Sequence, residues 1–282
     1  MPVTDALADA REQFLALVAD IRPELHRYCA RLTGSVIEGE DIVQDALAKA
    51  FYALSLSPEV PPLRPWLFRI AHNAAVDFLR SHGHKLTDPS DEIEVAEDAP
   101  DPLIVRTALA RFAALPLTQR SAVILKDVLG QSLEEVAETM DTTILAVKAA
   151  LVRGRAKLRE LADAPHIPAP EHAALDRYAT LFNARDWEGL RALIAEDCRL
   201  DLVGKSQRRG KAVGMYFSRY EREAVRLVVG LLEGRAALAA HIGDAPAPSY
   251  FILLDVTDGK VESIRDFRYT PYIAADADWR PL

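Results

Sequence analysis

Two segments without apolar periodicity divide the chain of 282 residues into three blocks. The first, 83–102, holds seven acidic residues and three prolines, and its self-repelling charge favours an extended, flexible chain. The second, 162–171, holds three prolines, which block helix continuation and stiffen the backbone. We therefore expect separate modules at 5–82, 103–161 and 172–282, joined by an acidic flexible linker and a proline-rich linker.

The pattern of apolar residues predicts helices in the first two blocks and a mixed third block. In the first block, apolar side chains recur with the helical period at 14–21, 25–32 and 42–54, and a fourth helix follows a proline-rich loop. The second block contains four shorter helical runs. The third opens with two helices and ends in two β-branched runs around Asp258-Gly259, a pair typical of a hairpin turn. The predicted fold class is multidomain, with two all-α domains followed by an α+β domain.

Charge and composition exclude several classes of protein. The formal net charge of −8 argues mildly against a nucleic-acid binder, yet the segment 148–159 holds five basic residues and no acidic one. No apolar run approaches the roughly 18 residues that span a bilayer, so we expect no membrane segment. Cys29 and Cys198 are isolated, which favours a reducing, cytoplasmic location and no metal centre.

The segment 131–160 has the pattern of a helix-turn-helix, in which two short helices meet at a steep angle. Ala137 is the small residue required where the helices cross, Asp141 occupies the turn that needs a left-handed backbone, and Val147 anchors the second helix. Thr142 or Thr143 can cap that second helix. The shared apolar core is expected to contain Val136, Met140, Leu145 and Leu151.

The second helix would present its outer face to duplex DNA, with early residues in the major groove and later basic residues on phosphates. An ordinary helical hairpin with a solvated basic face is the alternative. The candidate DNA contacts are Thr142, Thr143, Ala146, Lys148, Ala149, Val152, Arg153, Arg155 and Lys157.

Both helical blocks carry segments of a known family. These segments are 31–35 (RLTGS), 40–54 (EDIVQDALAKAFYAL), 65–80 (PWLFRIAHNAAVDFLR), 115–140 (LPLTQRSAVILKDVLGQSLEEVAETM) and 147–160 (VKAALVRGRAKLRE). Together they resemble a bacterial sigma factor of the extracytoplasmic-function type, in the sigma-70 family. The resemblance implies that 5–82 is sigma region 2, which binds core RNA polymerase and the minus-ten element. It also implies that 103–161 is sigma region 4, which reads the minus-thirty-five element.

The resemblance assigns roles to two groups in the first block. The core polymerase-binding residues would be Glu40, Asp41, Gln44 and Asp45. Asp41 and Asp45 are compatible with this role because residues four apart share one helix face, although a plain solvated acidic face has the same pattern.

The second group would hold the melted minus-ten DNA and consists of Arg69, His72, Asn73 and Arg80. Trp66 and Phe68 could stack on bases, but aromatic residues in such a helix more often belong to the core.

The outer face of the helix after Asp141 departs from the family pattern. Ala149 and Val152 stand where relatives often carry polar side chains, which implies weaker base readout or contacts to thymine methyl groups. Gly154 stands where relatives carry alanine, at a cost of about 1 kcal/mol in helix propensity.

The third block resembles a SnoaL-like domain, the cone-shaped α+β fold shared with polyketide cyclases and ketosteroid isomerase. The resemblance rests on 178–217 (YATLFNARDWEGLRALIAEDCRLDLVGKSQRRGKAVGMYF). This fold usually surrounds an apolar pocket, which could bind a small molecule. Candidate acids and bases are Asp201, His241, Asp255 and Asp266, and candidate hydrogen-bond donors are Tyr178, Tyr216, Tyr250 and Tyr269. Each could instead have a purely structural role.

The sequence therefore predicts a cytoplasmic sigma factor that binds core RNA polymerase and promoter DNA. We expect neither catalysis nor a cofactor, and we expect the third block to modulate activity in cis, through a ligand or an intramolecular contact. One alternative is a SnoaL-like enzyme or ligand sensor fused to a helix-turn-helix regulator. Another is a repressor that binds duplex DNA without polymerase, against which the first block argues.

Overall fold

The computed structural model describes residues 3–57, 59–81, 109–160 and 173–282. Both expected linkers, 83–102 and 162–171, lie outside the described residues. The chain separates into two compact units, Met1–Ala164 and Pro165–Leu282, which we call the helical unit and the α+β unit. No helix of the described residues has the length and apolar character that crossing a membrane requires.

The first half of the helical unit consists of helices, as the sequence predicts. They are α1 (Val3–Leu17), α2 (Arg22–Thr33), α3 (Val36–Leu56) and α4 (Leu63–Ser81), although α1 ends inside the predicted helical run 14–21. Gly34 ends α2 in the left-handed conformation, with φ of 85°. Ser35 then begins α3 because its hydroxyl accepts a hydrogen bond from the backbone N–H of Glu38 at 3.3 Å.

Over the described residues 109–160, the second half of the helical unit forms four helical runs, the number expected for the second block. They are α6 (Leu109–Ala113), α7 (Leu117–Val123) continued by the π-helical turn η1 (Ile124–Val128), α8 (Leu133–Thr139) and α9 (Ile144–Glu160). Ser132 and Glu135 form a reciprocal capping box at the start of α8, which satisfies two backbone N–H groups.

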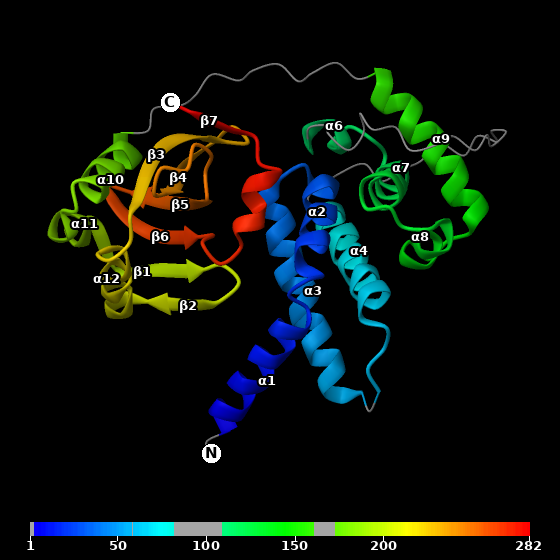
Figure 1. The fold of residues 1–282 in the computed structure, drawn as a ribbon, viewed down its shortest axis with the longest axis horizontal. Coiled ribbons are helices and arrows are strands. Elements are labelled where there is room, and N and C mark those ends of the chain that lie inside the picture. The colour runs from blue at the N-terminus through cyan, green and yellow to red at the C-terminus, as the bar shows by residue number, and fades with distance from the viewer. Residues whose placement is uncertain (1–2, 58, 82–108, 161–172) are drawn as a thin grey trace. The chain divides into compact units, whose positions relative to one another are not determined.

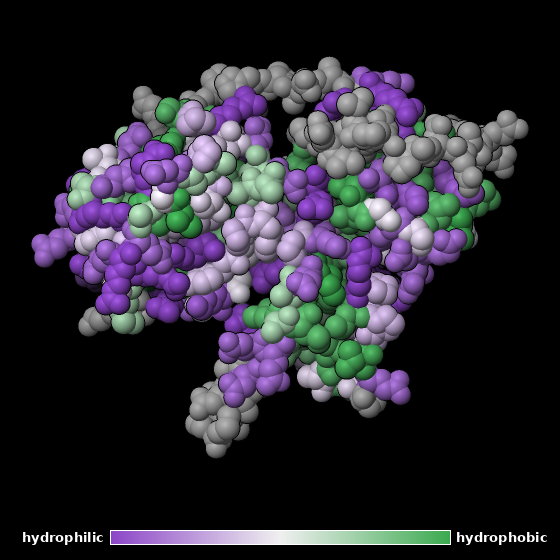
Figure 2. All heavy atoms as spheres, in the orientation of Figure 1, coloured by the Kyte–Doolittle hydropathy of each residue, from purple (hydrophilic) through white to green (hydrophobic). Residues whose placement is uncertain are grey.

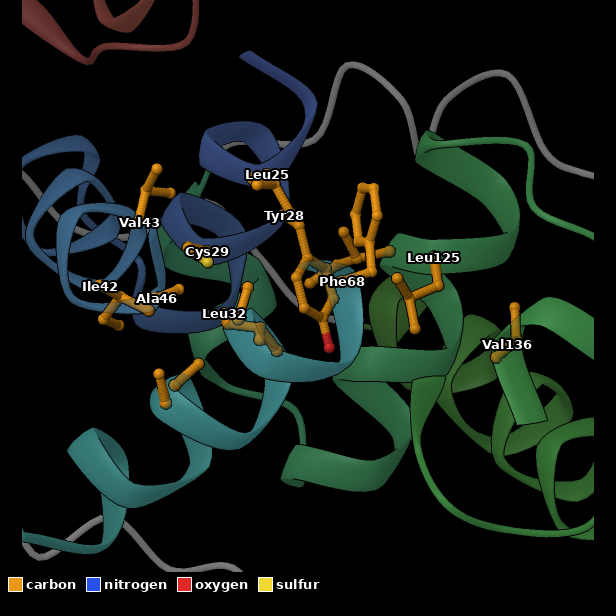
Figure 3. Close-up of a cluster of buried hydrophobic side chains, with 14 of the residues drawn as sticks. Leu25, Tyr28, Cys29, Leu32, Ile42, Val43, Ala46, Phe68, Leu125 and Val136 are labelled. Carbon is orange, nitrogen blue, oxygen red and sulfur yellow. The ribbon is translucent and has the colours of Figure 1, made fainter. Parts of the chain in front are cut away.

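One apolar core joins the two halves of the helical unit, where the sequence predicted separate modules. Figure 3 shows Tyr28 and Phe68 from α2 and α4 in the same cluster as Leu125 and Val136 from η1 and α8. Phe68 is fully buried and therefore belongs to the core. Arg120 of α7 reinforces the contact by donating hydrogen bonds to backbone carbonyls on both sides, among them that of Leu32.

The α+β unit confirms the class expected for the third block. Its helices and helical turns are α10 (Ala173–Asn183), α11 (Trp187–Leu193), η2 (Gly210–Met215), α12 (Phe217–Tyr220) and η3 (Pro271–Ala275). Its strands are β1 (Ile194–Leu202), β2 (Ser206–Arg209), β3 (Val225–Leu232), β4 (Arg235–Ile242), β5 (Tyr250–Thr257), β6 (Lys260–Asp266) and β7 (Trp279–Pro281).

These strands form one mixed sheet against which helices pack (Figure 1). The strand order is β2-β1-β6-β5-β4-β3-β7, and the β1–β6 pair is parallel while the others are antiparallel. Helix α10 packs against β3 and β4. The predicted hairpin is present, since β5 and β6 pair antiparallel. Asp258 and Gly259 form its turn with positive φ, at 50° and 73°.

Candidate nucleic-acid interface

Helices α8 and α9 form the predicted helix-turn-helix. Asp141 adopts the left-handed conformation in the turn, with φ of 50°. Ala137 and Val147 are both buried where the two helices meet. The Thr143 hydroxyl caps α9 by accepting a hydrogen bond from the backbone N–H of Ala146 at 3.2 Å. The turn therefore fixes where α9 begins and which of its faces points outward.

Leu145 does not belong to the shared core, so its assignment to that core was wrong. Its side chain is 69% exposed, and that of its neighbour Ile144 is 40% exposed. The buried face of α9 instead includes Val147 and Leu151. Leu145 precedes Val147 by two residues, which places it about 200° around a helix that turns roughly 100° per residue.

Most of the predicted DNA contacts lie at exposed or half-buried positions in the turn and on α9. Thr142, Thr143 and Lys157 are exposed, whereas Ala146, Lys148, Ala149, Val152 and Arg153 are half-buried. Their contacts with DNA remain a prediction.

Arg155 is the exception, because it is buried and paired inside the helical unit. Its guanidinium donates two hydrogen bonds to the carboxylate of Asp127 in η1, with N–O distances of 2.9 and 2.7 Å. In this conformation the guanidinium is directed at Asp127 and buried, so the structure does not support the predicted phosphate contact of Arg155. The residue instead fixes α9 against η1.

Gly154 permits the close packing of α9 on α7. A Cβ atom at this position would lie 2.8 Å from Cγ2 of Val123 and 3.2 Å from the carbonyl oxygen of Gln119. The glycine therefore has a packing reason that the helix propensity alone did not reveal.

Three of the four predicted minus-ten residues lie exposed on α4, namely Arg69, Asn73 and Arg80. His72 is largely buried, which corrects its expected place at the surface. Its Nδ1 lies 2.7 Å from the hydroxyl of Tyr28. Burial lowers the pKa of His72 to about 4, so the imidazole is neutral at pH 7.

Two of the four predicted polymerase-binding residues share an exposed face of α3. Asp41 and Asp45 are exposed, and Asp45 forms an ion pair with Lys49 at 2.7 Å. Gln44 is half-buried. Glu40 is fully buried and pairs with Arg22 of α2, so its placement on an accessible docking face is wrong.

Glu40 lies where α2 and α3 cross most closely. A Cβ atom on the adjacent Gly39 would lie 2.5 Å from the backbone nitrogen of Ala30. The close crossing removes this side of α3 from solvent. A buried carboxylate is costly unless it is paired with a positive charge, which Arg22 supplies for Glu40.

A pocket of about 640 Å³ lies between α4, α7 and the turn of the helix-turn-helix. Asn73 and Arg80 line it from α4, Ser121 lines it from α7, and Asp141 and Thr142 line it from the turn. The two elements expected to read different parts of a promoter thus face one cavity within the helical unit.

In the α+β unit, the structure brings one of the four candidate acids together with candidate donors. Asp266 is fully buried and accepts hydrogen bonds from the hydroxyls of Tyr216 and Tyr220, at 2.8 and 2.6 Å. Its other oxygen accepts from the backbone N–H of Arg268 at 2.9 Å. Tyr250 donates to the Tyr220 hydroxyl at 3.2 Å. Burial raises the pKa of Asp266 despite these donors.

Among the described residues, the other candidates have no hydrogen bond to Asp266. Asp201 pairs with Arg265 at 3.6 Å, Nδ1 of the buried His241 lies 3.0 Å from the carbonyl oxygen of Ala245, and Asp255 is exposed. Tyr269 is half-buried and accepts from Arg219 at 2.8 Å.

Tyr178 and Tyr220 also belong to the surroundings of Asp266. The buried Tyr178 hydroxyl has no hydrogen-bond partner among the described residues. Sequence reasoning missed Tyr220, although its spacing of four from Tyr216 places both on one helix face.

Comparison with known proteins agrees with the helix-turn-helix and with the bundle that precedes it. The family models Sigma-70 region 2 and Sigma-70, region 4 match residues 17–85 and 106–158. The RNA polymerase sigma factor CarQ of Myxococcus xanthus is 30% identical over 157 residues, which cover 54% of this chain and 90% of CarQ. The chain belongs to the extracytoplasmic-function sigma factors. As a sigma factor, it acts in transcription initiation with core RNA polymerase and promoter DNA.

Two further comparisons extend over most of this sigma factor. The ECF RNA polymerase sigma factor SigG of Mycobacterium tuberculosis is 28% identical over 303 aligned positions, covering 92% of this chain and 82% of SigG. The extracytoplasmic function sigma factor SigJ of the same species, known from a crystal structure, is 23% identical in sequence to this chain. The structural alignment covers 91% of this chain and 98% of SigJ, with a TM-score of 0.38.

Proposed function

We propose that this sigma factor docks on core RNA polymerase through the exposed Asp41 and Asp45 face of α3, and that it does so in the cytoplasm. The outer face of α9 then reads the minus-thirty-five element, while Arg69, Asn73 and Arg80 of α4 hold the minus-ten element. The proposal rests on one observation: a helical bundle with an exposed acidic face is followed in the chain by a helix-turn-helix whose turn contains the left-handed Asp141.

Promoter binding on this proposal requires α4 and the helix-turn-helix to separate. The two promoter elements lie about 25 base pairs apart, which corresponds to roughly 85 Å of duplex at 3.4 Å per step. In the helical unit, by contrast, Asn73, Asp141 and Thr142 line one pocket. We infer that the closed helical unit opens when it binds polymerase.

Charge reversal of the acidic face is expected to weaken polymerase binding. The double variant Asp41→Lys, Asp45→Lys should bind core polymerase at least roughly tenfold more weakly, because like charges across an interface cost affinity. Both side chains are exposed, so folding should be unaffected. Titration of fluorescently labelled factor with core enzyme, without DNA, measures the change.

A matched control makes the same change of charge elsewhere. Glu134 and Glu138 are exposed and four apart on α8, so Glu134→Lys, Glu138→Lys should leave core binding within twofold of wild type. Equal affinity of the Asp41, Asp45 variant and the wild-type factor would contradict the proposed docking face.

The α+β unit is proposed to regulate the helical unit in cis. Because Met1–Ala164 is a compact unit, removing 165–282 should leave a folded factor whose promoter-dependent transcription differs from that of the full chain. A reconstituted assay with core polymerase measures the difference, and equal output from both proteins would contradict this role.

A ligand-binding or enzymatic α+β unit is the second candidate function, and the Asp266 cluster is the observation that favours it. An acid and tyrosine donors do lie within hydrogen-bond reach. However, both carboxylate oxygens of Asp266 already accept hydrogen bonds, as expected of a group that anchors the core. We therefore favour regulation over catalysis, and the absence of catalysis remains an expectation.

A further inference from the structure

Two large aliphatic side chains are exposed at the start of α9. Ile144 and Leu145 are the exposed large hydrophobic residues within the described range 109–160, and Leu145 exposes 69% of its surface. Figure 2 shows hydrophobic atoms at the surface where α8 and α9 meet. Apolar surface stabilises a fold by leaving water, so the exposed surface of Leu145 is not explained by the packing of the helical unit.

The position of Leu145 is fixed by the turn that precedes it. The left-handed Asp141 ends the turn, and the Thr143 cap locks the first residues of α9. In a helix-turn-helix the first residues of the second helix are those that enter the major groove and touch base edges. Leu145 is therefore placed where sequence is read.

The chemistry around Leu145 identifies its partner. Apart from the buried Arg155, the range 142–159 contains the basic residues Lys148, Arg153, Lys157 and Arg159 and no acidic residue, so this surface suits a polyanion. Within the major groove, the C5 methyl group of thymine is the apolar feature of the base edges. The basic residues can therefore contact the phosphates of duplex DNA while the aliphatic side chain of Leu145 contacts a thymine methyl group.

We infer that Leu145 is a specificity-determining residue that packs against a thymine methyl group in the minus-thirty-five element, with Ile144 beside it. This inference rests on the proposed role of α9 in reading that element. It replaces the core role that the sequence suggested for Leu145, and it adds a base contact that no polar side chain of α9 provides.

The test first identifies the promoter sequence that the holoenzyme prefers and then removes single thymine methyl groups from that promoter. The holoenzyme, made from core polymerase and the full chain, selects promoters from a library randomised over the minus-thirty-five region. Each thymine of the selected element is then replaced by deoxyuridine, which lacks the methyl group. At one or two positions, wild-type binding should weaken by roughly three- to fivefold, as expected for one buried methyl-sized group.

The variant Leu145→Ala links that loss to this side chain. It should bind the thymine promoter as weakly as the wild-type holoenzyme binds the deoxyuridine promoter, and uracil should cause it no further loss. Leu17→Ala is the matched control, because Leu17 is a 56% exposed leucine on α1, and it should keep the full sensitivity to uracil. Leu145→Gln, which retains length without apolar character, should behave as the alanine variant does.

The outcomes separate this inference from the proposed function. If the wild-type holoenzyme selects a promoter but tolerates uracil at every position, or if Leu145→Ala remains sensitive to uracil, the inference is wrong and the sigma function stands. A selected element without thymine on either strand would also overturn the inference alone. If the holoenzyme selects no sequence at all, the proposed function of α9 and this inference both fail.

Discussion

Replacement of Asp127 by alanine is expected to lower the free energy of unfolding of the helical unit by about 3–5 kcal/mol. The carboxylate accepts two hydrogen bonds from Arg155, and both side chains are buried. Without Asp127 the guanidinium would be a buried, unpaired charge between η1 and α9. The loss should therefore be several times larger than that of an exposed ion pair.

The fluorescence of Trp66 can report unfolding of the helical unit within the full chain. The chain has three tryptophans, and replacing Trp187 and Trp279 of the α+β unit by phenylalanine leaves Trp66 as the reporter during urea unfolding. Lys157→Ala is the control on the same helix and should change stability by less than about 0.5 kcal/mol, because Lys157 is exposed.

A double variant separates the structural role of Arg155 from the phosphate contact that the sequence suggested. Asp127→Leu, Arg155→Met removes both charges and should recover most of the lost stability. It should also bind promoter DNA as the wild type does. A stable double variant with strongly impaired DNA binding would show that Arg155 contacts DNA after all.

The sequence predicted the local features of the helix-turn-helix because each depends on neighbouring residues. The left-handed turn at Asp141, the cap at Thr143 and the buried Ala137 all follow from spacing within 12 residues. The hairpin at Asp258 follows in the same way from its turn chemistry.

The errors at Arg155 and Glu40 arose because the burial of each depends on a partner distant in the sequence. Arg155 is 28 residues from Asp127, and Glu40 is 18 residues from Arg22, so neither pair is visible as a motif. Periodicity offered a partial signal, because Arg155 follows the buried Leu151 by four residues and shares its helix face. The single core of the helical unit could not be predicted either, since it depends on how two helical blocks pack on each other.

A fall in pH is expected to destabilise the helical unit through His72. Burial holds the pKa of His72 at about 4, whereas an unfolded histidine titrates near 6.5. The unfolded chain therefore binds the proton more readily between these values. The stabilisation is fully present above pH 6.5 and is lost as the pH falls towards 4, by about 3 kcal/mol in total.

The variant His72→Asn distinguishes this effect from the titration of acidic groups. An asparagine amide can either accept or donate the hydrogen bond that joins Nδ1 of His72 to the Tyr28 hydroxyl, but it does not titrate. Urea unfolding followed by Trp66 fluorescence at pH 7 and pH 5 should show a loss of about 2 kcal/mol for the wild type that the variant largely lacks. Equal losses in both proteins would assign the acid sensitivity to other groups. Because His72 lines the pocket between α4 and the helix-turn-helix, such a loss would place acid sensitivity at the contact that we expect to open on polymerase.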